Sequence, residues 1–251
     1  MSGTSMDGLV ALVTGAASGM GAATARLFAE GGAFVALADV NADGISELAW
    51  QLGARAQAFP LDVGDADAIA RTVEEIGQWQ GRIDALVNNA GIAGHAPIDS
   101  PDYDALWERI LRVNLSAHQR IIRAALPFLR KSAHPRIVNI ASTEALGATA
   151  LGSAYSAAKA GVTGLTRGLA VELGREGITV NAVCPGPITT GMTAAIPETD
   201  KEVYAKRRTA LRRYGRPEEV AHITVALCQP GASYITGATI PVDGGLMARN
   251  A

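Results

Sequence analysis

The chain has 251 residues, with 22 Lys and Arg against 24 Asp and Glu, which gives a formal net charge of −2. Hydrophobic residues make up 48% of the sequence, enough for a large core, and this share excludes a disordered chain. The near-neutral charge argues against a general nucleic-acid-binding protein, which usually presents a basic face. The sequence shows neither a long apolar run nor a secretory signal pattern, so we expect a cytoplasmic protein with no membrane partner.

Short apolar runs alternate with longer amphipathic segments, which predicts strands alternating with helices. In chain order we expect a flexible leader at 1–7, strand 9–13, helix 19–31, strand 34–38, helix 41–52, strand 56–61, helix 65–79, strand 83–87, an interrupted helix 102–130, strand 136–140, helix 152–175, strand 179–183, a flap at 190–212 with a helix near 199–211, helix 218–228 and strand 235–242. Strands joined through helices are parallel, with right-handed crossovers. The sequence therefore predicts an α/β fold: one doubly wound parallel sheet of about seven strands with helices on both faces, in a single domain over 8–251.

Glycines follow the first predicted strand with the spacing GxxxGxG, as Gly15, Gly19 and Gly21. At a strand-to-helix turn, such glycines let backbone N–H groups approach a pyrophosphate, which sits at the positive end of the helix. Ser18 and Met20 belong to the same loop. The loop predicts a dinucleotide site in a Rossmann-type sheet, and the alternative is a glycine-rich turn that serves packing alone.

Asp39 ends the second predicted strand and can accept hydrogen bonds from both ribose hydroxyls of an adenosine. A carboxylate there also repels a 2′-phosphate. One charge pair at about 4 Å is worth roughly 4 kcal/mol at an effective dielectric near 20, which is about a thousandfold in affinity. Neighbouring Val40 and Ser18 offer no compensating positive charge. Asp39 therefore predicts NAD rather than NADP as the cofactor, unless it only caps the following helix.

Further motifs follow in a fixed order along the chain. They are NNAG at 88–91, Asn114, Ser142, YSAAK from Tyr155 to Lys159, and PGPI at 185–188. With the glycine loop, this order resembles the short-chain dehydrogenases/reductases across about residues 8–246. Within that family the chain resembles NAD- or NADP-dependent alcohol dehydrogenases and ketone reductases, including 3-oxoacyl reductases.

The resemblance implies roles for these residues. It makes Asn114, Ser142, Tyr155 and Lys159 the catalytic set, with the Asn114 backbone carbonyl holding a water that links Lys159 to a proton relay. Beside Gly15, Ser18, Gly19, Met20, Gly21 and Asp39, it implies cofactor contacts from Asp62, Val63, Asn89, Ala90, Gly91, Tyr155, Lys159, Pro185, Gly186, Ile188 and Thr190. It implies no metal site, and the histidines and cysteines of the sequence form no cluster with metal-ligand spacing.

Tyr155 and Lys159 are four residues apart on a predicted helix, so their side chains share one face. A tyrosine has an ordinary pKa of about 10, and a nearby ammonium favours its phenolate. We therefore expect Lys159 to lower the pKa of Tyr155. Tyr155 would then take the hydroxyl proton of an alcohol during oxidation or donate a proton to a carbonyl during reduction. The Ser142 hydroxyl would hold the substrate oxygen against Tyr155.

Substrate contacts are expected from Ser142, Glu144, Tyr155 and Met192. Glu144 could meet a polar or cationic substrate group, or it could face solvent or pair with an arginine. Met192 could line an apolar wall or pack within the flap. His95 could touch the substrate, although a surface position is the alternative.

A basic stretch lies in and after the flap. It consists of Lys201, Lys206, Arg207, Arg208, Arg212 and Arg213. It could attract an acyl carrier protein or a coenzyme A phosphate, or it could be a solvated helix face.

The expected function is hydride transfer between NAD(H) and a small secondary alcohol or ketone. The alternative reaction is reduction of a 3-oxoacyl thioester carried by acyl carrier protein, and a non-catalytic cofactor-binding regulator is a third hypothesis. The helix at 152–175 carries Ala157, Gly161, Gly164 and Gly168, a stripe of small residues that allows close approach of another element. Because the resembled family uses its two long helices as an interface, we expect a homotetramer.

Overall fold

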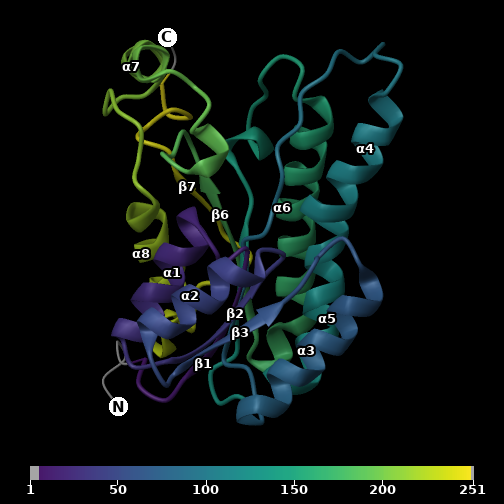
Figure 1. Ribbon diagram of the computed structural model, residues 1–251, viewed down its shortest axis with the longest axis vertical. Coiled ribbons are helices and arrows are strands. Elements are labelled where there is room, and N and C mark those ends of the chain that lie inside the picture. Colours follow the sequence, from purple (N-terminus) through teal and green to yellow (C-terminus); the bar gives the residue numbers. More distant parts are fainter. Residues whose placement is uncertain (1–5, 250–251) are drawn as a thin grey trace.

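The structure, a computed structural model, describes residues 6–249 (Figure 1). Residues 1–5, most of the expected leader, lie outside the described residues, whereas Met6 is buried against Gly31. The described strands are β1 (Val10–Thr14), β2 (Phe34–Asp39), β3 (Ala56–Pro60), β4 (Ala85–Asn88), β5 (Arg136–Ile140), β6 (Thr179–Pro185) and β7 (Thr239–Val242). They form one sheet in the order β3-β2-β1-β4-β5-β6-β7, and its strand pairs are parallel. The predicted doubly wound parallel sheet is confirmed.

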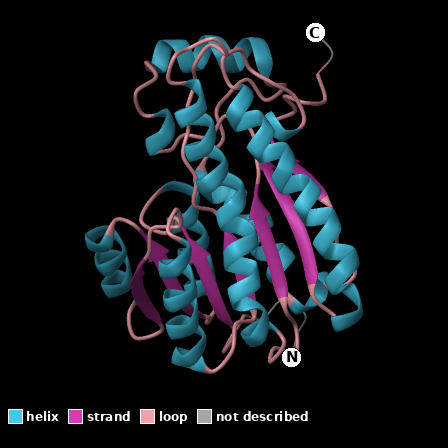
Figure 2. Cartoon of the chain, turned by 90° about the vertical axis from the view of Figure 1, so that its right-hand side faces the viewer, coloured by secondary structure: helices cyan, strands magenta, loops and turns pink. Residues whose placement is uncertain are grey.

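Helices cover both faces of this sheet (Figures 1 and 2). One face carries α1 (Gly19–Glu30), α2 (Ala42–Leu52) and α8 (Pro217–Cys228), and the other carries α3 (Ala66–Gln80), α5 (Ala117–Leu129) and α6 (Ser153–Leu173). The shorter helices α4 (Tyr103–Leu111) and α7 (Glu198–Arg208) both lie toward the upper end of the molecule in Figure 1. Over residues 6–249, the helices are too short or too polar to cross a membrane.

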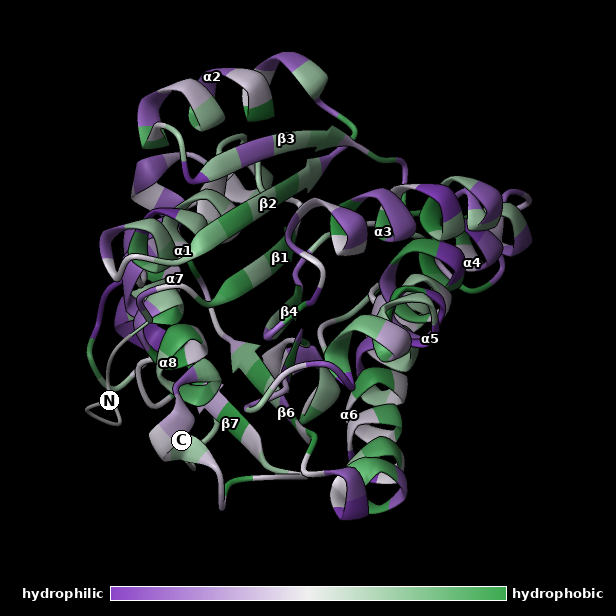
Figure 3. Cartoon of the chain, turned by 90° about the horizontal axis from the view of Figure 1, so that it is seen from below, coloured by the Kyte–Doolittle hydropathy of each residue, from purple (hydrophilic) through white to green (hydrophobic). Residues whose placement is uncertain are grey.

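The inner strands are apolar because both of their faces are covered. On β1, Leu12 packs into the core under α3, α5 and α6, and Val13 packs into the core under α1, α2 and α8. Leu86 and Ile137 face the same side as Leu12 from β4 and β5. Figure 3 shows β1 and β2 mostly in the green of hydrophobic residues, between the two helix layers. This alternation decides which layer each strand residue faces, including the polar residues at the strand ends.

Two elements differ from their predicted bounds. The predicted helix over 102–130 is divided by a π-helical turn, η1 (Arg112–Ser116), which separates α4 from α5. The predicted strand 235–242 begins only at Thr239, because Gly237 has a φ of +71° and the chain turns there before it enters the sheet. Both differences depend on tertiary packing or glycine conformation, which apolar periodicity does not report.

Candidate active site

A cavity of about 430 Å³ lies beside β1 and β4, where the order of the strands in the parallel sheet reverses. Ligands of doubly wound sheets bind at the carboxyl ends of the strands beside such a point. Its lining includes the predicted residues Gly15, Ser18, Gly19, Met20, Asp39, Asn89, Ala90, Gly91, Thr190 and Met192. Ile92, Ala93 and Gly191 also line it. The sequence analysis missed Ile92, and it expected Ala93 and Gly191 only as members of the loop 93–97 and the flap 190–212, from which substrate choice was predicted. The cavity lies within the size range of small-molecule and cofactor sites.

The glycine loop between β1 and α1 leaves the start of α1 open to a ligand. Gly15 has a φ of +66°, a conformation that glycine adopts without strain, and Gly21 packs on the Gly15 carbonyl where a side chain would collide. Ser18 makes no side-chain capping bond to α1, whereas Asn41 and Asp65 cap α2 and α3. The first N–H groups of α1 therefore fit a pyrophosphate, which the positive end of the helix dipole also favours.

The loops after β1 and β4 are held together by side-chain hydrogen bonds. The Asn89 amide nitrogen Nδ2 donates to the carbonyls of Thr14 at 3.0 Å and Gly15 at 3.1 Å. The Thr14 hydroxyl accepts from the backbone N–H groups of Asn89 and Ala90 at 3.0 and 3.1 Å. Asn89 thus lies beside the cavity and also fixes the shape of the glycine loop.

The Asp39 carboxylate lies at the junction of this cavity with a neighbouring one of about 170 Å³. One oxygen accepts from the Ala17 N–H at 3.0 Å and the other from the Asn41 N–H at 2.9 Å. Asp39 therefore holds the glycine loop and the start of α2, and each oxygen keeps a further lone pair for a ligand. Among the described residues that line these two cavities, none is Lys or Arg.

The smaller cavity contains two of the predicted contacts, Asp62 and Val63, with Leu61 and Val40 opposite Ala90 and Gly91. Its position next to Asp39 fits an adenine ring, with apolar side chains on the ring faces and a carboxylate for a polar edge.

Six predicted cofactor contacts lie outside the lining of these cavities, and two of them, Tyr155 and Lys159, are described below with the catalytic side chains. Gly21 supports Gly15, as described above. The Gly186 N–H donates to the Val242 carbonyl at 3.0 Å, and Ile188 is buried against Gly215. With Pro185, these residues hold the base of the flap, and their contact with a cofactor stays a prediction.

The candidate catalytic side chains meet at the carboxyl end of β5. Lys159 on α6 is only 3% exposed, and its Nζ donates to the Ile140 carbonyl at 2.8 Å. The same Nζ lies 5.7 Å from the centre of the Tyr155 ring. A Cβ on Gly91, which lines the larger cavity, would stand 3.7 Å from Nζ. The Lys159 ammonium therefore lies directly behind the cavity wall.

The pKa shifts of this pair differ from the sequence prediction. Burial raises the pKa of Tyr155 to about 12, partly offset by a side-chain hydrogen bond with Ser142, and the Glu144 charge raises it further. Burial lowers the pKa of Lys159 to about 8. The expected lowering of the Tyr155 pKa is wrong for this structure, because loss of water disfavours both charged forms more than the pair favours them.

Asn114 lies within the π-helical turn, and its side chain is fully occupied by one partner. Its Oδ1 accepts from the Ile92 N–H at 2.9 Å and its Nδ2 donates to the Ile92 carbonyl at 2.8 Å. This pairing ties the loop after β4 to the turn between α4 and α5. A π-helical turn interrupts the regular i→i−4 bonding, which leaves backbone groups near Asn114 for other partners.

The Glu144 carboxylate bonds to its own chain rather than to an arginine. It accepts from the Thr149 N–H at 2.9 Å, the Thr149 hydroxyl at 2.7 Å and the Ser156 hydroxyl at 2.9 Å. The Ser142 hydroxyl accepts from the Glu144 N–H at 3.1 Å. Glu144 thus fastens the loop after β5 to the start of α6, one residue beyond Tyr155. Contact of Glu144 with a substrate stays a prediction, as it does for exposed Met192.

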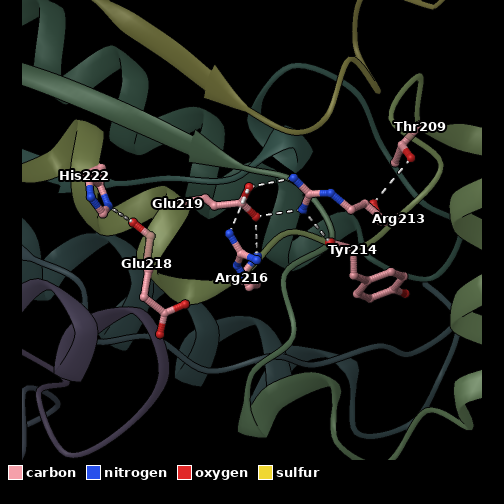
Figure 4. A network of polar contacts seen from close by, with 7 residues as sticks. All are labelled: Thr209, Arg213, Tyr214, Arg216, Glu218, Glu219 and His222. Atoms are coloured by element: carbon pink, nitrogen blue, oxygen red, sulfur yellow. Dashed lines mark hydrogen bonds and ion pairs between the residues drawn. The ribbon is translucent and has the colours of Figure 1, made fainter.

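Much of the basic stretch is held in ion pairs. Lys201 is buried and pairs with Glu198 at 2.7 Å, and Lys206 pairs with Glu202 at 3.1 Å. Figure 4 shows Arg213 directed at Glu219, with the shorter contact at 2.6 Å. These pairs reduce the charge that the stretch offers to an anionic partner. Over residues 6–249 the structure shows no cluster of three or more side chains suited to a metal.

Comparisons with known proteins match nearly the whole chain. A family model described as enoyl-(acyl carrier protein) reductase matches residues 15–247. The chain is 40% identical to 3-oxoacyl-[acyl-carrier-protein] reductase FabG of Thermotoga maritima, over 96% of this chain and 99% of that protein. It is 39% identical to meso-2,3-butanediol dehydrogenase of Serratia marcescens, over 96% of each. The solved Pseudomonas aeruginosa RhlG/NADP active-site complex is similar at a TM-score of 0.91 and 34% identity, over 97% of this chain and 98% of that one.

The family match begins at Gly15 and extends past Ser142, Tyr155 and Lys159, so it includes the whole site described above. The relatives align with nearly the whole of this chain, and the similar solved structure has the same fold. From the site, the fold and these relatives, we conclude that the chain is an oxidoreductase of the short-chain dehydrogenase/reductase family.

Proposed function

We propose that this oxidoreductase transfers a hydride between NAD(H) and a small secondary alcohol or its ketone, with Tyr155 as general acid and base. The observation that carries the proposal is the position of the Lys159 ammonium directly behind the cavity that the glycine loop opens, with the centre of the Tyr155 ring 5.7 Å from its Nζ. The Tyr155 hydroxyl and the Lys159 ammonium can donate or accept a proton. The open start of α1 offers backbone N–H groups to a pyrophosphate.

Nicotinamide, when bound, supplies or accepts the hydride. The hydroxyl of Ser142, two residues after the end of β5, holds the substrate oxygen next to the Tyr155 hydroxyl. In ketone reduction Tyr155 donates its proton to that oxygen, and in alcohol oxidation it takes the proton back. The raised pKa of Tyr155, about 12, keeps the hydroxyl protonated near neutral pH and so favours the donor role. Lys159 places a positive charge behind Tyr155 and stabilises the phenolate that this step leaves.

The proposed preference for NAD is supported by Asp39. Its carboxylate lies where a 2′-phosphate would add negative charge, and no Lys or Arg from the described residues lines either cavity there. The similar solved structure from Pseudomonas aeruginosa is an NADP complex, so the cofactor preference of this chain is tested directly with both cofactors.

A second candidate is reduction of a 3-oxoacyl thioester bound to an acyl carrier protein. It is favoured by the 40% identity to the Thermotoga maritima 3-oxoacyl-[acyl-carrier-protein] reductase. Against it, Lys201, Lys206 and Arg213 are already paired with glutamates, which leaves less free charge for an acidic carrier.

The test is turnover, followed by NADH or NADPH absorbance, with secondary and cyclic alcohols, polyols, hydroxysteroids, ketones and a 3-oxoacyl thioester. Turnover of a plain secondary alcohol or ketone with NAD(H) is expected. Selective NADPH-dependent reduction of the thioester would overturn the proposal in favour of the second candidate.

A further inference from the structure

A group of buried polar side chains lies in the core close to Lys159. We call Asn88, His118, Asn139 and Thr166 the buried polar seam. All four are at most 2% exposed. Asn88 and Asn139 are paired in register on β4 and β5. Asn88 Nδ2 donates to Asn139 Oδ1 at 2.9 Å, and Asn139 Nδ2 donates to the Thr166 hydroxyl at 3.0 Å.

Periodicity places the seam in the same layer as Lys159. Asn88 and Asn139 each come two residues after Leu86 and Ile137, which face the core under α3, α5 and α6. His118 lies one turn after Asn114 on the inward face of α5. Thr166 lies two turns after Lys159 along α6, so the seam joins four elements, β4, β5, α5 and α6.

The seam is incompletely hydrogen-bonded. Within the described residues, Asn88 Oδ1 and both ring nitrogens of His118 are buried and make no hydrogen bond of regular geometry. The Asn139 side chain still interacts with the His118 ring, which opposes part of the lowering of the His118 pKa. Buried polar atoms without a hydrogen bond lower the stability of the fold. An apolar side chain of similar size at this position would make the protein more stable. The only other buried side-chain atom of this kind in residues 6–249 is the Thr179 hydroxyl, at the opposite end of the sheet. The cost in stability suggests that His118 serves the site rather than the fold.

The seam faces a charge that needs polar surroundings. The Lys159 ammonium carries three N–H donors, and the structure gives it one acceptor within the described chain, the Ile140 carbonyl. Burial, with the Lys159 charge, lowers the pKa of His118 to about 3, so the imidazole is neutral at ordinary pH and does not repel the ammonium. The other titratable groups around Lys159 are Tyr155 on its own helix and the Cys184 thiol of β6, which in turn feels the Asp243 carboxylate.

We propose that His118 is a positioning residue of the reaction, whose neutral imidazole, together with Asn88 Oδ1, provides the polar surroundings that keep the Lys159 ammonium charged. The inference rests on the proposed function, because it assigns His118 to the same proton-transfer site. It explains why a polar, incompletely bonded side chain occupies a core position beside Ile121 and Ile122.

The test compares His118→Leu with His118→Asn and with the matched control Thr179→Val, which also removes a partnerless buried polar atom. In the reduction direction both Tyr155 and Lys159 act protonated, so kcat/KM falls as pH rises through the lower of the two pKa values, that of Lys159. In His118→Leu we expect this fall in kcat/KM about one pH unit lower than in the wild type. The reason is that the Lys159 ammonium loses one polar interaction, which lowers its pKa. His118→Asn should stay close to the wild type.

A second readout needs no activity. In protein labelled with 13C-lysine, the Lys159 Cε resonance, assigned with Lys159→Arg, should titrate at lower pH in His118→Leu than in the wild type. The melting temperature should stay the same or rise in both His118→Leu and Thr179→Val, because each replaces a partnerless polar group, while only His118→Leu moves the titration.

An unchanged Lys159 titration in His118→Leu, or an equal shift in Thr179→Val, would overturn the inference. Absence of turnover in the wild type would instead contradict the proposed function, and the resonance would still decide the role of His118.

Discussion

The pKa values of Tyr155 and Lys159 are shifted away from the direction that their spacing suggests. Their separation of four residues on one helix was enough to predict that they lie together, and the structure places Nζ 5.7 Å from the ring centre. Spacing alone could not show that both are buried, and burial raises the pKa of Tyr155 while it lowers that of Lys159. Desolvation depends on the strands and loops packed around the pair, which no local pattern contains.

Glu144 acts on Tyr155 through charge. Because its carboxylate raises the pKa of Tyr155, Glu144→Gln should lower that pKa. In the proposed alcohol oxidation Tyr155 is the base, so the rising limb of the pH profile of kcat/KM is expected at lower pH in this variant. The measurement is that profile beside Glu218→Gln, an exposed carboxylate on α8 whose replacement should leave it unchanged. A limb that stays in place in Glu144→Gln, or moves to higher pH, would contradict this effect.

The proposed preference for NAD rests on repulsion between Asp39 and a 2′-phosphate. Asp39→Asn should raise the ratio of kcat/KM for NADP to that for NAD, by up to about a thousandfold for removal of one close charge pair and less after salt screening. The ratio is the useful quantity, because the variant also weakens one backbone bond to Ala17 or Asn41 for both cofactors alike. Asp43→Asn, an exposed carboxylate in the first turn of α2, should leave the ratio unchanged. Equal ratios in Asp39→Asn and wild type would refute the argument.

At the scale of elements, the sequence predicted strands better than interruptions. The strands are short apolar runs covered on both faces, so their bounds could be predicted within a residue or two, as for β5 at Arg136–Ile140. The exception is the start of β7, which lies four residues later than predicted. The π-helical turn at Arg112–Ser116 could not be located, because it is fixed by the bonds between Asn114 and Ile92 rather than by helix propensity. The seam around His118 was also missed, since a single histidine in an apolar helix face gives no sequence signal.

The packing of α3 on α5 depends on Gly77. A Cβ there would overlap the Phe128 ring, so Gly77→Ala forces the two helices apart. Overpacking costs about 1–3 kcal/mol, from which the higher helix propensity of alanine recovers up to about 1 kcal/mol. Chemical denaturation should therefore show a loss of about 1–2 kcal/mol in the free energy of unfolding. The control Gly174→Ala, with open space and helical φ, should be neutral or slightly stabilising, and equal effects of the two changes would disprove the packing argument.

At the scale of the whole molecule, the alternation of strands and helices was sufficient to predict the sheet, because parallel crossovers leave few arrangements. It could not predict the ion pair between Arg213, which directly follows the flap, and Glu219 in the first turn of α8 (Figure 4). It also could not separate the two roles of the small residues on α6. A side chain at Gly161 would meet Leu115 of the same chain, whereas Gly164 and Gly168 have open space beside them.

The open glycines make the proposed homotetramer testable. Gly164 and Gly168 are exposed on the outward side of α6, next to Val171, which is 84% exposed. If a second copy packs there, Gly168→Trp should reduce the assembly measured by sedimentation at micromolar concentration while the chain stays folded. Glu47→Trp, exposed on α2, is the matched control and should keep the wild-type mass. A wild-type protein that sediments only as a monomer would contradict the homotetramer.

The central claim is that Tyr155 transfers the substrate proton beside a dinucleotide held by the glycine loop. The most direct test measures turnover and NADH binding together in wild type and Tyr155→Phe, which removes one hydroxyl and keeps the ring. We expect turnover to fall by about 10²–10⁴, the range of general acid–base catalysis, with NADH affinity little changed. Turnover within a few fold of the wild type, with NADH still bound, would contradict the assignment of Tyr155.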